Sequence, residues 1–159
     1  MNRVNYILFH PVFRSALAQI DELERNRPFC GHGLEHLLSV ARLACLYNIE
    51  EGHGVSRELL YAAALLHDIG RGEQYLHGTP HAEAGARLAE PILVGCGFSE
   101  PERQRICAAI SAHRQEGAGE DPLPMLLHRA DRKSRPCWLC PASTECNWPP
   151  ERRNPELEL

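Results

Sequence analysis

The sequence lacks any hydrophobic run long enough to cross a membrane. Its longest uninterrupted apolar stretch is Leu59–Leu66, eight residues, whereas a transmembrane helix needs roughly 20. The first residues, MNRVNYILFHPVFRSALAQ, contain neither a long apolar stretch nor a small-residue cleavage site, so we predict no signal peptide. Both absences lead us to expect a cytoplasmic protein that does not act at a membrane.

A strong excess of charge of one sign is absent as well. The 159 residues include 17 basic and 21 acidic side chains, which gives a formal net charge of −4. This balance argues against generic nucleic-acid binding, although it leaves room for a local basic patch. Internal repeats and low-complexity segments are also missing. The mixture of 43% apolar and 24% charged residues is typical of one globular domain.

No segment alternates apolar and polar residues with the period of two that is typical of half-buried strands. Capping residues and apolar periodicity instead indicate an all-α, compact bundle of about six helices over residues 1–133. The expected helices cover roughly Pro11–Arg25, Leu34–Tyr47, 57–68, 80–94, 99–113 and 121–133. Gly70 and Gly72 are expected to end the third helix, and Thr79 to cap the fourth. Ser99 and Glu102 have the spacing of a capping box for the fifth.

Residues 134–159 differ in composition from the rest of the chain. This segment holds five prolines, three cysteines and both tryptophans. Proline at that density does not form a helix, because it removes backbone donors and clashes with the preceding turn. We therefore predict an irregular tail, rich in proline and cysteine, that packs on the bundle.

The expected helix at 57–68 ends in a histidine and an aspartate, His67 and Asp68. Because this helix is apolar all round, we expect it to be buried. A carboxylate at the end of a buried helix is costly unless it is paired or binds a cation, and it is also unfavourable near the negative end of the helix dipole. The dipeptide alone is consistent with a structural His–Asp pair or with a cation site.

The wider pattern favours a metal site. His36 in GLEHLLSVA, His67 and Asp68 in AALLHDIG, and Asp131 in a final AD follow in an order that resembles the HD-domain superfamily of metal-dependent phosphohydrolases. The resemblance covers roughly residues 28–135. It implies a helical bundle with a divalent metal at its centre, held by these four side chains. Iron, manganese, zinc, nickel or cobalt would suit the donors, and the metal would activate water against a phosphoryl group.

Two further histidines bear on the number of metal ions, one or two. His81 lies in an H-x-x-x-G-A segment and His113 in an I-x-x-H segment, which resemble the dinuclear members of the superfamily, dinucleoside tetraphosphate hydrolases among them. The resemblance implies that both are ligands and that Asp68 bridges two ions or orients the attacking water. The connection from Asp68 to His81 is short for that subset, so the alternative is that both histidines contact substrate. His32 is interpreted as a loop residue, with the alternative that it joins the pocket beside Cys30.

Several basic residues are candidates for binding a phosphate. Arg71 follows the glycine of HDIG, where many relatives have a basic residue, and we expect it to share the catalytic role with Asp68. Arg42, Arg114 and Lys133 lie near the ligand-bearing positions and are expected to bind substrate as forks or point charges. Each of them alone could equally be a solvated surface residue.

The cysteines suggest a second metal site. Seven is an odd number, and cytoplasmic thiols stay reduced, so we predict no disulfide framework. Cys137, Cys140 and Cys146 lie close together in the tail, and Cys30 is the candidate for a fourth ligand, which would suit zinc or an iron–sulfur cluster. The alternative is that these are reduced linker thiols. The pattern FCGHGLEH…AALLHDIGR…ADRKSRPCWLCPASTECNW resembles a bacterial HD subgroup with the same tail.

The sequence therefore predicts a metal-dependent phosphohydrolase. Its substrate would be a nucleotide or another small phosphate ester, attacked by metal-activated water. Two alternatives stay open: a dinuclear-iron oxygenase of the same superfamily, and a non-catalytic metal or redox sensor that uses the cysteine tail.

Overall fold

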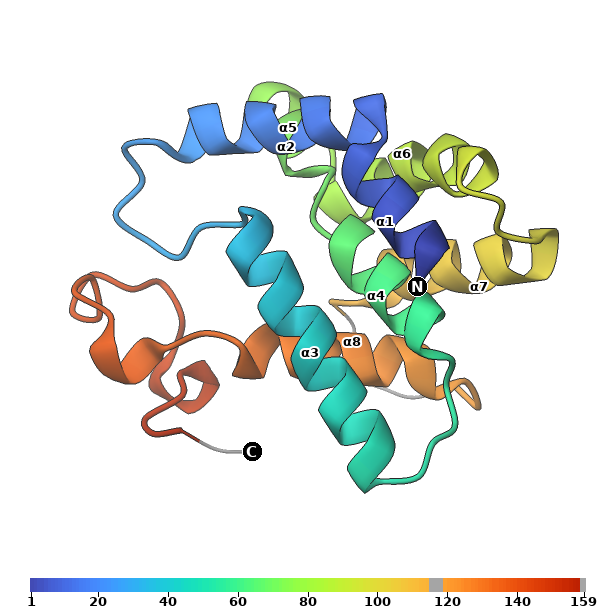
Figure 1. Cartoon of the computed structure of the whole chain (residues 1–159). Coiled ribbons are helices and arrows are strands. Elements are labelled where there is room, and N and C mark those ends of the chain that lie inside the picture. The colour runs from blue at the N-terminus through green and yellow to red at the C-terminus, as the bar shows by residue number, and fades with distance from the viewer. Residues whose placement is uncertain (115–118, 158–159) are drawn as a thin grey trace.

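The computed structural model describes residues 1–114 and 119–157. Within these ranges the chain forms eight α-helices and two short 3-10 helices and no strand, so the all-α prediction is confirmed (Figure 1). The α-helices are α1 Asn2–Phe9, α2 Pro11–Glu24, α3 Leu34–Glu50, α4 Arg57–Leu66, α5 Arg71–His77, α6 His81–Gly95, α7 Glu100–Ala112 and α8 Pro122–Lys133. None of these helices combines the length and apolar character needed to cross a membrane.

Helix α4 is the central element of the bundle. It packs against α1, α3, α7 and α8 (Figure 1). Every residue from Ala62 to Leu66 is fully buried. The three consecutive alanines Ala62–Ala64 let neighbouring helices approach closely, while Leu65 and Leu66 supply apolar area. Each buried leucine contributes about 1.5–3 kcal/mol. The end of α4 consequently lies deep inside the protein.

Two short helices were not expected from the sequence. The turn at His10 separates α1 from α2, because its Nδ1 accepts a hydrogen bond from the backbone of Val12 at 3.3 Å and Pro11 starts the new helix. Helix α5 begins just after Gly70 and contains Gly72, so the prediction that these glycines only terminate a helix was wrong. The termination itself comes earlier, because α4 ends at Leu66.

Both glycines lie in close contact with other segments, and at Gly70 the contact is with backbone atoms that cannot move aside. A Cβ atom on Gly70 would lie 2.2 Å from the carbonyl oxygen of His81 and 2.4 Å from the backbone nitrogen of Gly85. On Gly72 it would lie 2.2 Å from Oε1 of Gln19. Gly70 therefore lets the segment after α4 lie directly against α6, which places His81 beside the end of α4.

Other helix ends agree with the expected caps. Ser99 and Glu102 form the predicted capping box of α7, and the carboxylate of Asp121 accepts from the backbone nitrogen of Leu123 at 3.0 Å to cap α8. At α6 the prediction was one residue early: Pro80, rather than Thr79, precedes the first helical residue. Proline is favoured near a helix start, but here it precedes the first turn instead of opening it.

The tail is held to the bundle by side chains rather than by regular structure. Its 3-10 helices cover only Cys137–Leu139 and Pro150–Arg152. The amide of Asn154 donates to the carbonyl oxygens of Arg132 and Arg135, both at 2.8 Å, and Asn154 is buried. These bonds bring the end of the tail back to α8.

Gly70→Ala should destabilise the fold strongly. The added methyl group meets backbone atoms that cannot rotate away, so we expect a loss of about 3 kcal/mol or more in the free energy of unfolding. Urea denaturation followed by circular dichroism measures it. Gly119→Ala is the matched control, because nothing lies within 4 Å of that Cβ position. Equal stability of the two variants would contradict the close-packing argument.

Candidate metal centre

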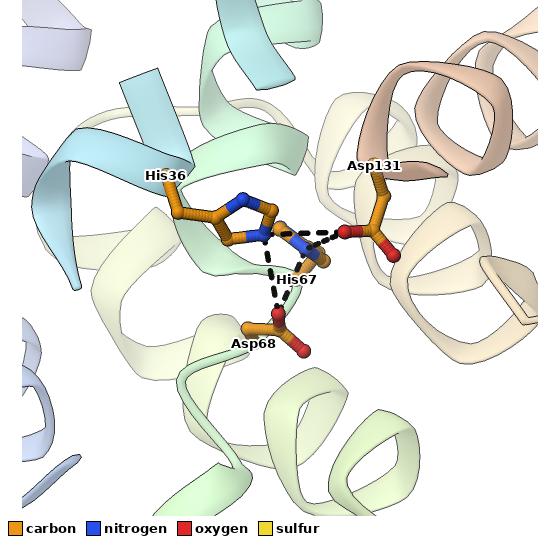
Figure 2. A group of neighbouring side chains, drawn as sticks. All are labelled: His36, His67, Asp68 and Asp131. Atoms are coloured by element: carbon orange, nitrogen blue, oxygen red, sulfur yellow. Dashed lines mark ion pairs between the residues drawn. The ribbon is translucent and has the colours of Figure 1, made fainter. Parts of the chain in front are cut away.

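Four side chains from three parts of the bundle converge at the buried end of α4 (Figure 2). His36 comes from the first turn of α3, His67 and Asp68 directly follow α4, and Asp131 lies in the last turn of α8. Nε2 of His36 lies 3.2 Å from Oδ1 of Asp131 and 3.6 Å from Oδ2 of Asp68. Nε2 of His67 lies 3.1 Å from that same Oδ2 and 3.7 Å from Oδ1 of Asp131. These are the four residues that the HD resemblance implied.

Hydrogen bonds fix how the imidazole rings are oriented. Nδ1 of His67 donates to the carbonyl oxygen of Ala64 at 2.7 Å, so Nε2 is the ring nitrogen that faces the centre. Nδ1 of His36 faces the hydroxyl of Ser134 at 3.3 Å, and that hydroxyl donates to the carbonyl oxygen of Asp131. Such outer partners select the tautomer in which Nε2, rather than Nδ1, faces the centre.

Two buried atoms at the centre have no hydrogen-bond partner within the described residues. They are Nε2 of His67 and Oδ2 of Asp68. Leaving such an atom unsatisfied costs about 1–3 kcal/mol, more where it is charged. A ring nitrogen and a carboxylate oxygen facing the same point fit a divalent cation, so the residues present suit the metal that the sequence predicted.

A second group of ligand atoms shares Asp68 with the first. It contains Asp68, His81 at the start of α6 and His113 directly after α7. Nδ1 of His113 donates to the carbonyl oxygen of Ile110, and Nδ1 of His81 faces the side-chain oxygen of Gln74. The two Nε2 atoms therefore turn lone pairs toward each other across 3.2 Å, which is unfavourable unless a cation lies between them.

The protonation states agree with ligand roles. Burial lowers the pKa of His81 to about 3 and that of His113 to about 4, so both rings are neutral near pH 7. Burial alone would raise the pKa of Asp68, but the charges of His67 and Arg71 hold it well below its usual range. Burial alone would lower the pKa of His67, yet the neighbouring carboxylates Asp68 and Asp131 raise it to about 10, so a metal ion at Nε2 would take the place of a proton. Asp68 and Asp131 are both ionised, and two buried carboxylates that face the same point favour a cation there.

The predicted basic residues divide into two groups. Arg71 donates from Nε to Oδ1 of Asp68 at 2.9 Å, and with Arg114 it lines a cavity of about 240 Å³ beside the centre. Arg42 and Lys133 line neither this cavity nor any other described cavity at the centre, and Arg42 is exposed. Helical geometry gives the reason. At about 100° per residue, Arg42 lies roughly 120° around α3 from His36, and Lys133 roughly 160° around α8 from Asp131.

Arg135 is a residue of the site that the sequence reasoning missed. Its side chain is buried, Nη1 donates to the carbonyl oxygen of Gly31 at 2.6 Å, and Nη2 lies 2.9 Å from Nε2 of His36 and 3.5 Å from Oδ1 of Asp131. Its Nε is buried with no partner in the described part of the chain. The available signal was its spacing, four residues after Asp131, which places it one helical turn further on.

His32 lies in the loop before α3, as expected, and it also lines the cavity beside Cys30. It is 5% exposed, and its ring bonds through Nδ1 to the carboxylate of Glu24, which also accepts from the Tyr75 hydroxyl. Burial alone would raise the pKa of Glu24, but these hydrogen bonds lower it to about 2. His32 lines the same cavity as Arg71, so Nε2 is its remaining polar atom for a ligand there.

The cysteines are all free thiols, as predicted. Cys30 lies near Cys137 and Cys140. Burial is the main cause that raises the pKa of the Cys30 thiol, and the two neighbouring thiols raise it further. Cys146 lines the cavity of about 240 Å³ together with Cys30. Among the described residues, however, no three cysteine sulfurs lie within 4.8 Å of one another. The four-thiolate site therefore stays a prediction.

Comparisons with known proteins agree with this geometry. A family model described as the HD domain matches residues 33–135, which include both groups of ligand atoms. An uncharacterized protein of Clostridium beijerinckii is 38% identical over 154 residues, 97% of each chain. Ribonuclease Y of Oleidesulfovibrio alaskensis is 29% identical over 125 residues, which are 79% of this chain; the chain spans only 22% of that protein. The crystal structure of a predicted HD superfamily hydrolase from an uncultured Thermotogales bacterium superposes with a TM-score of 0.64 at 26% identity, covering 88% of this chain and 80% of that one.

Metal content should divide between the two groups of ligands. We expect protein loaded with Mn²⁺ and desalted to lose one ion per chain in His81→Ala and essentially all bound ions in Asp68→Asn, because Asp68 belongs to both groups. Inductively coupled plasma mass spectrometry gives the stoichiometry. His77→Ala, an exposed histidine, is the control. The same metal content in wild type and His81→Ala would assign His81 to substrate contact instead.

The tail cysteines have a separate test. Protein purified without oxygen should lose zinc, or iron together with acid-labile sulfide, when Cys137, Cys140 and Cys146 are all changed to Ser. Metal at the His/Asp groups should remain, because the cysteines share no ligand with them. Unchanged metal and sulfide content would show that the cysteine cluster holds no metal and that the tail cysteines only pack.

Proposed function

The chain belongs to the HD-domain family, and from this premise we propose that it is a metal-dependent phosphohydrolase acting on a nucleotide or a similar small phosphate ester. One observation carries the proposal. Asp68 is fully buried and shared by two sets of imidazole nitrogens, and its Oδ2 faces Nε2 of His67 at 3.1 Å and Nε2 of His36 at 3.6 Å without a hydrogen bond. Such an arrangement has no evident packing role, and it suits chemistry at divalent cations.

The ligand residues form two groups, each of which would hold one metal ion. His36, His67, Asp68 and Asp131 would hold one ion, and Asp68, His81 and His113 a second. Ions at these positions supply a water of lowered pKa and polarise the phosphoryl oxygens. Asp68 is ionised, so its carboxylate accepts a hydrogen bond and can orient a water molecule for attack.

Three guanidinium groups surround the place where a phosphate would lie. Arg71, Arg114 and Arg135 all line the cavity of about 240 Å³ that opens on the centre. Arginine matches phosphate geometry with paired donors, and fixed donors stabilise the charge that grows on the phosphoryl oxygens. His32, held by Glu24, offers Nε2 for a hydrogen bond with the ester.

Release of phosphate from a panel of esters tests the proposal. Chelated protein should be inactive and should regain activity with Mn²⁺, Fe²⁺ or Co²⁺. His67→Ala and Asp68→Asn should each lose about 10³-fold in kcat/KM, because several kcal/mol of charge stabilisation disappear. His77→Ala should retain activity.

Two results would contradict the proposal. Phosphate release that survives Asp68→Asn would place hydrolysis elsewhere. Oxygen consumption by the iron-loaded protein, with no release of phosphate from any ester, would favour an oxygenase.

A further inference from the structure

Arg135 places a positive charge against the first group of ligand atoms. Its Nη2 lies 2.9 Å from Nε2 of His36 and 3.5 Å from Oδ1 of Asp131, two side chains that point toward each other at the centre (Figure 2). Arg135 is only 5% exposed, and arginine stays protonated in proteins. Its guanidinium group therefore contacts two of the four side chains whose atoms form the first group, which are His36, His67, Asp68 and Asp131.

The hydroxyl of Ser134 determines which nitrogen of His36 accepts from Arg135. That hydroxyl has one hydrogen, which it donates to the carbonyl oxygen of Asp131 at 2.8 Å. It can therefore only accept from Nδ1 of His36, at 3.3 Å, so the ring hydrogen lies on Nδ1. The lone pair is then on Nε2, and Nη2 of Arg135 donates to it. A neutral imidazole has one such lone pair, and a metal ion at His36 would use the same one.

We propose that Arg135 competes with the metal ion for the first group of ligands and supplies the neutralising charge there when no ion is bound. The inference rests on the metal positions of the proposed function and adds their regulation, and it does not depend on the reaction. A metal ion binds His36 only when the guanidinium group leaves it. The first group consequently binds metal less tightly than its four donors alone would.

The balance of charge at the centre supports this competition. The carboxylates of Asp68 and Asp131 both face the centre. Nε of Arg71 lies 2.9 Å from Oδ1 of Asp68, and Nη2 of Arg135 lies 3.5 Å from Oδ1 of Asp131. Buried charges are stable only where opposite charge offsets them. A divalent ion added to two carboxylates and two guanidinium groups leaves an excess of positive charge, which favours the withdrawal of one guanidinium group.

The main chain that carries Arg135 is fixed. The carbonyl oxygen of Arg135 accepts from the backbone nitrogen of Cys137 at 2.9 Å and from the amide of Asn154 at 2.8 Å. The tail beyond it is held by the guanidinium group of Arg153. That group donates to the carbonyl oxygens of Trp148 at 2.7 Å, Ser143 at 2.8 Å and Cys146 at 2.9 Å. Displacement of Arg135 therefore needs a rotation of its side chain and no refolding of the tail.

The side chain of Arg135 has space for such a rotation. It lines two cavities, one of about 590 Å³ that also contains His36 and one of about 240 Å³ that also contains Asp131. Nη1 donates to the carbonyl oxygen of Gly31 at 2.6 Å, so one anchor can persist while Nη2 moves. Nε is buried without a hydrogen-bond partner among the residues that the structure describes. The observed position therefore leaves one donor of the guanidinium group unused, and a rotated side chain can recover it.

Two backgrounds of the full chain isolate the two groups of ligands. His113→Ala removes a ligand of the second group and leaves the first complete, and His36→Ala does the reverse, because Asp68 remains in both. Arg135→Met removes the guanidinium group but keeps an unbranched side chain, whereas Arg135→Lys retains a positive charge. Arg87→Met, on the surface, is the matched control. Calorimetric titration of the chelated protein with Co²⁺ gives each Kd.

The two backgrounds should respond differently. In His113→Ala we expect Arg135→Met to lower the Kd for Co²⁺ about tenfold or more, because the ion no longer displaces a charge-assisted hydrogen bond. In His36→Ala the same change should alter the Kd much less. Arg135→Lys keeps the charge but cannot make the same pair of hydrogen bonds, so its Kd should be intermediate. This variant also serves the comparison if Arg135→Met does not fold.

Thermal unfolding gives a readout that a packing role would not reproduce. In chelator, Arg135→Met should unfold at a lower temperature than the wild type, since the carboxylates of Asp68 and Asp131 then lose a neighbouring positive charge. With saturating Co²⁺ this difference should shrink or reverse, because the ion supplies that charge. Circular dichroism follows both transitions. A residue that only packed would destabilise the protein equally in both conditions.

The outcomes distinguish this inference from the proposed function. An affinity for Co²⁺ that is unchanged or weaker in Arg135→Met would overturn the competition, while metal-dependent hydrolysis would stand. A tighter first group in a protein that releases no phosphate from any ester would support the competition and contradict the hydrolase. If neither the wild type nor Arg135→Met binds Co²⁺, both proposals are wrong.

Discussion

An ionised carboxylate buried at the end of an apolar helix is the constraint on which the rest of this structure depends. Asp68 has no exposed surface, and α4 before it is surrounded by the core. A charge in that position is stable only when positive charge and hydrogen-bond donors meet it. Arg71 and the imidazole of His81 meet Oδ1, and the imidazoles of His36 and His67 face Oδ2. Helices α3, α6 and α8 are therefore arranged around a point where charge must be balanced.

The sequence predicts the parts of this centre that lie on helices. His36, His67, Asp68 and Asp131 could be named because the order of their motifs resembles the HD-domain superfamily, and the structure brings their ligand atoms within 4.8 Å. The helix ends with side-chain caps at Ser99 and Asp121 were predicted for the same local reason.

What the sequence did not reveal depends on contacts between distant segments. The partner of His32 is Glu24, and the two are joined across a loop that has no periodicity. Arg135 reaches the centre from the first residues of the tail, where proline content hides any pattern. Helix α5 was missed because glycines at 70 and 72 resemble a helix stop signal. These two positions instead lie close to α6 and to Gln19, and no local sequence pattern reveals those contacts. Arg42 and Lys133 are close in sequence to the ligands His36 and Asp131, but they point to other sides of their helices.

The bonds that Arg153 makes have a consequence for how this protein can change over time. All three go to main-chain carbonyl oxygens, which every residue provides, so the path of the tail does not depend on which side chains occupy positions 143, 146 and 148. Substitutions at positions 146 and 148, which line the cavity beside the centre, can therefore accumulate with little penalty to folding. Related chains could diverge in what they recognise through this short stretch while retaining the same catalytic core, much as antibody loops vary on a constant framework.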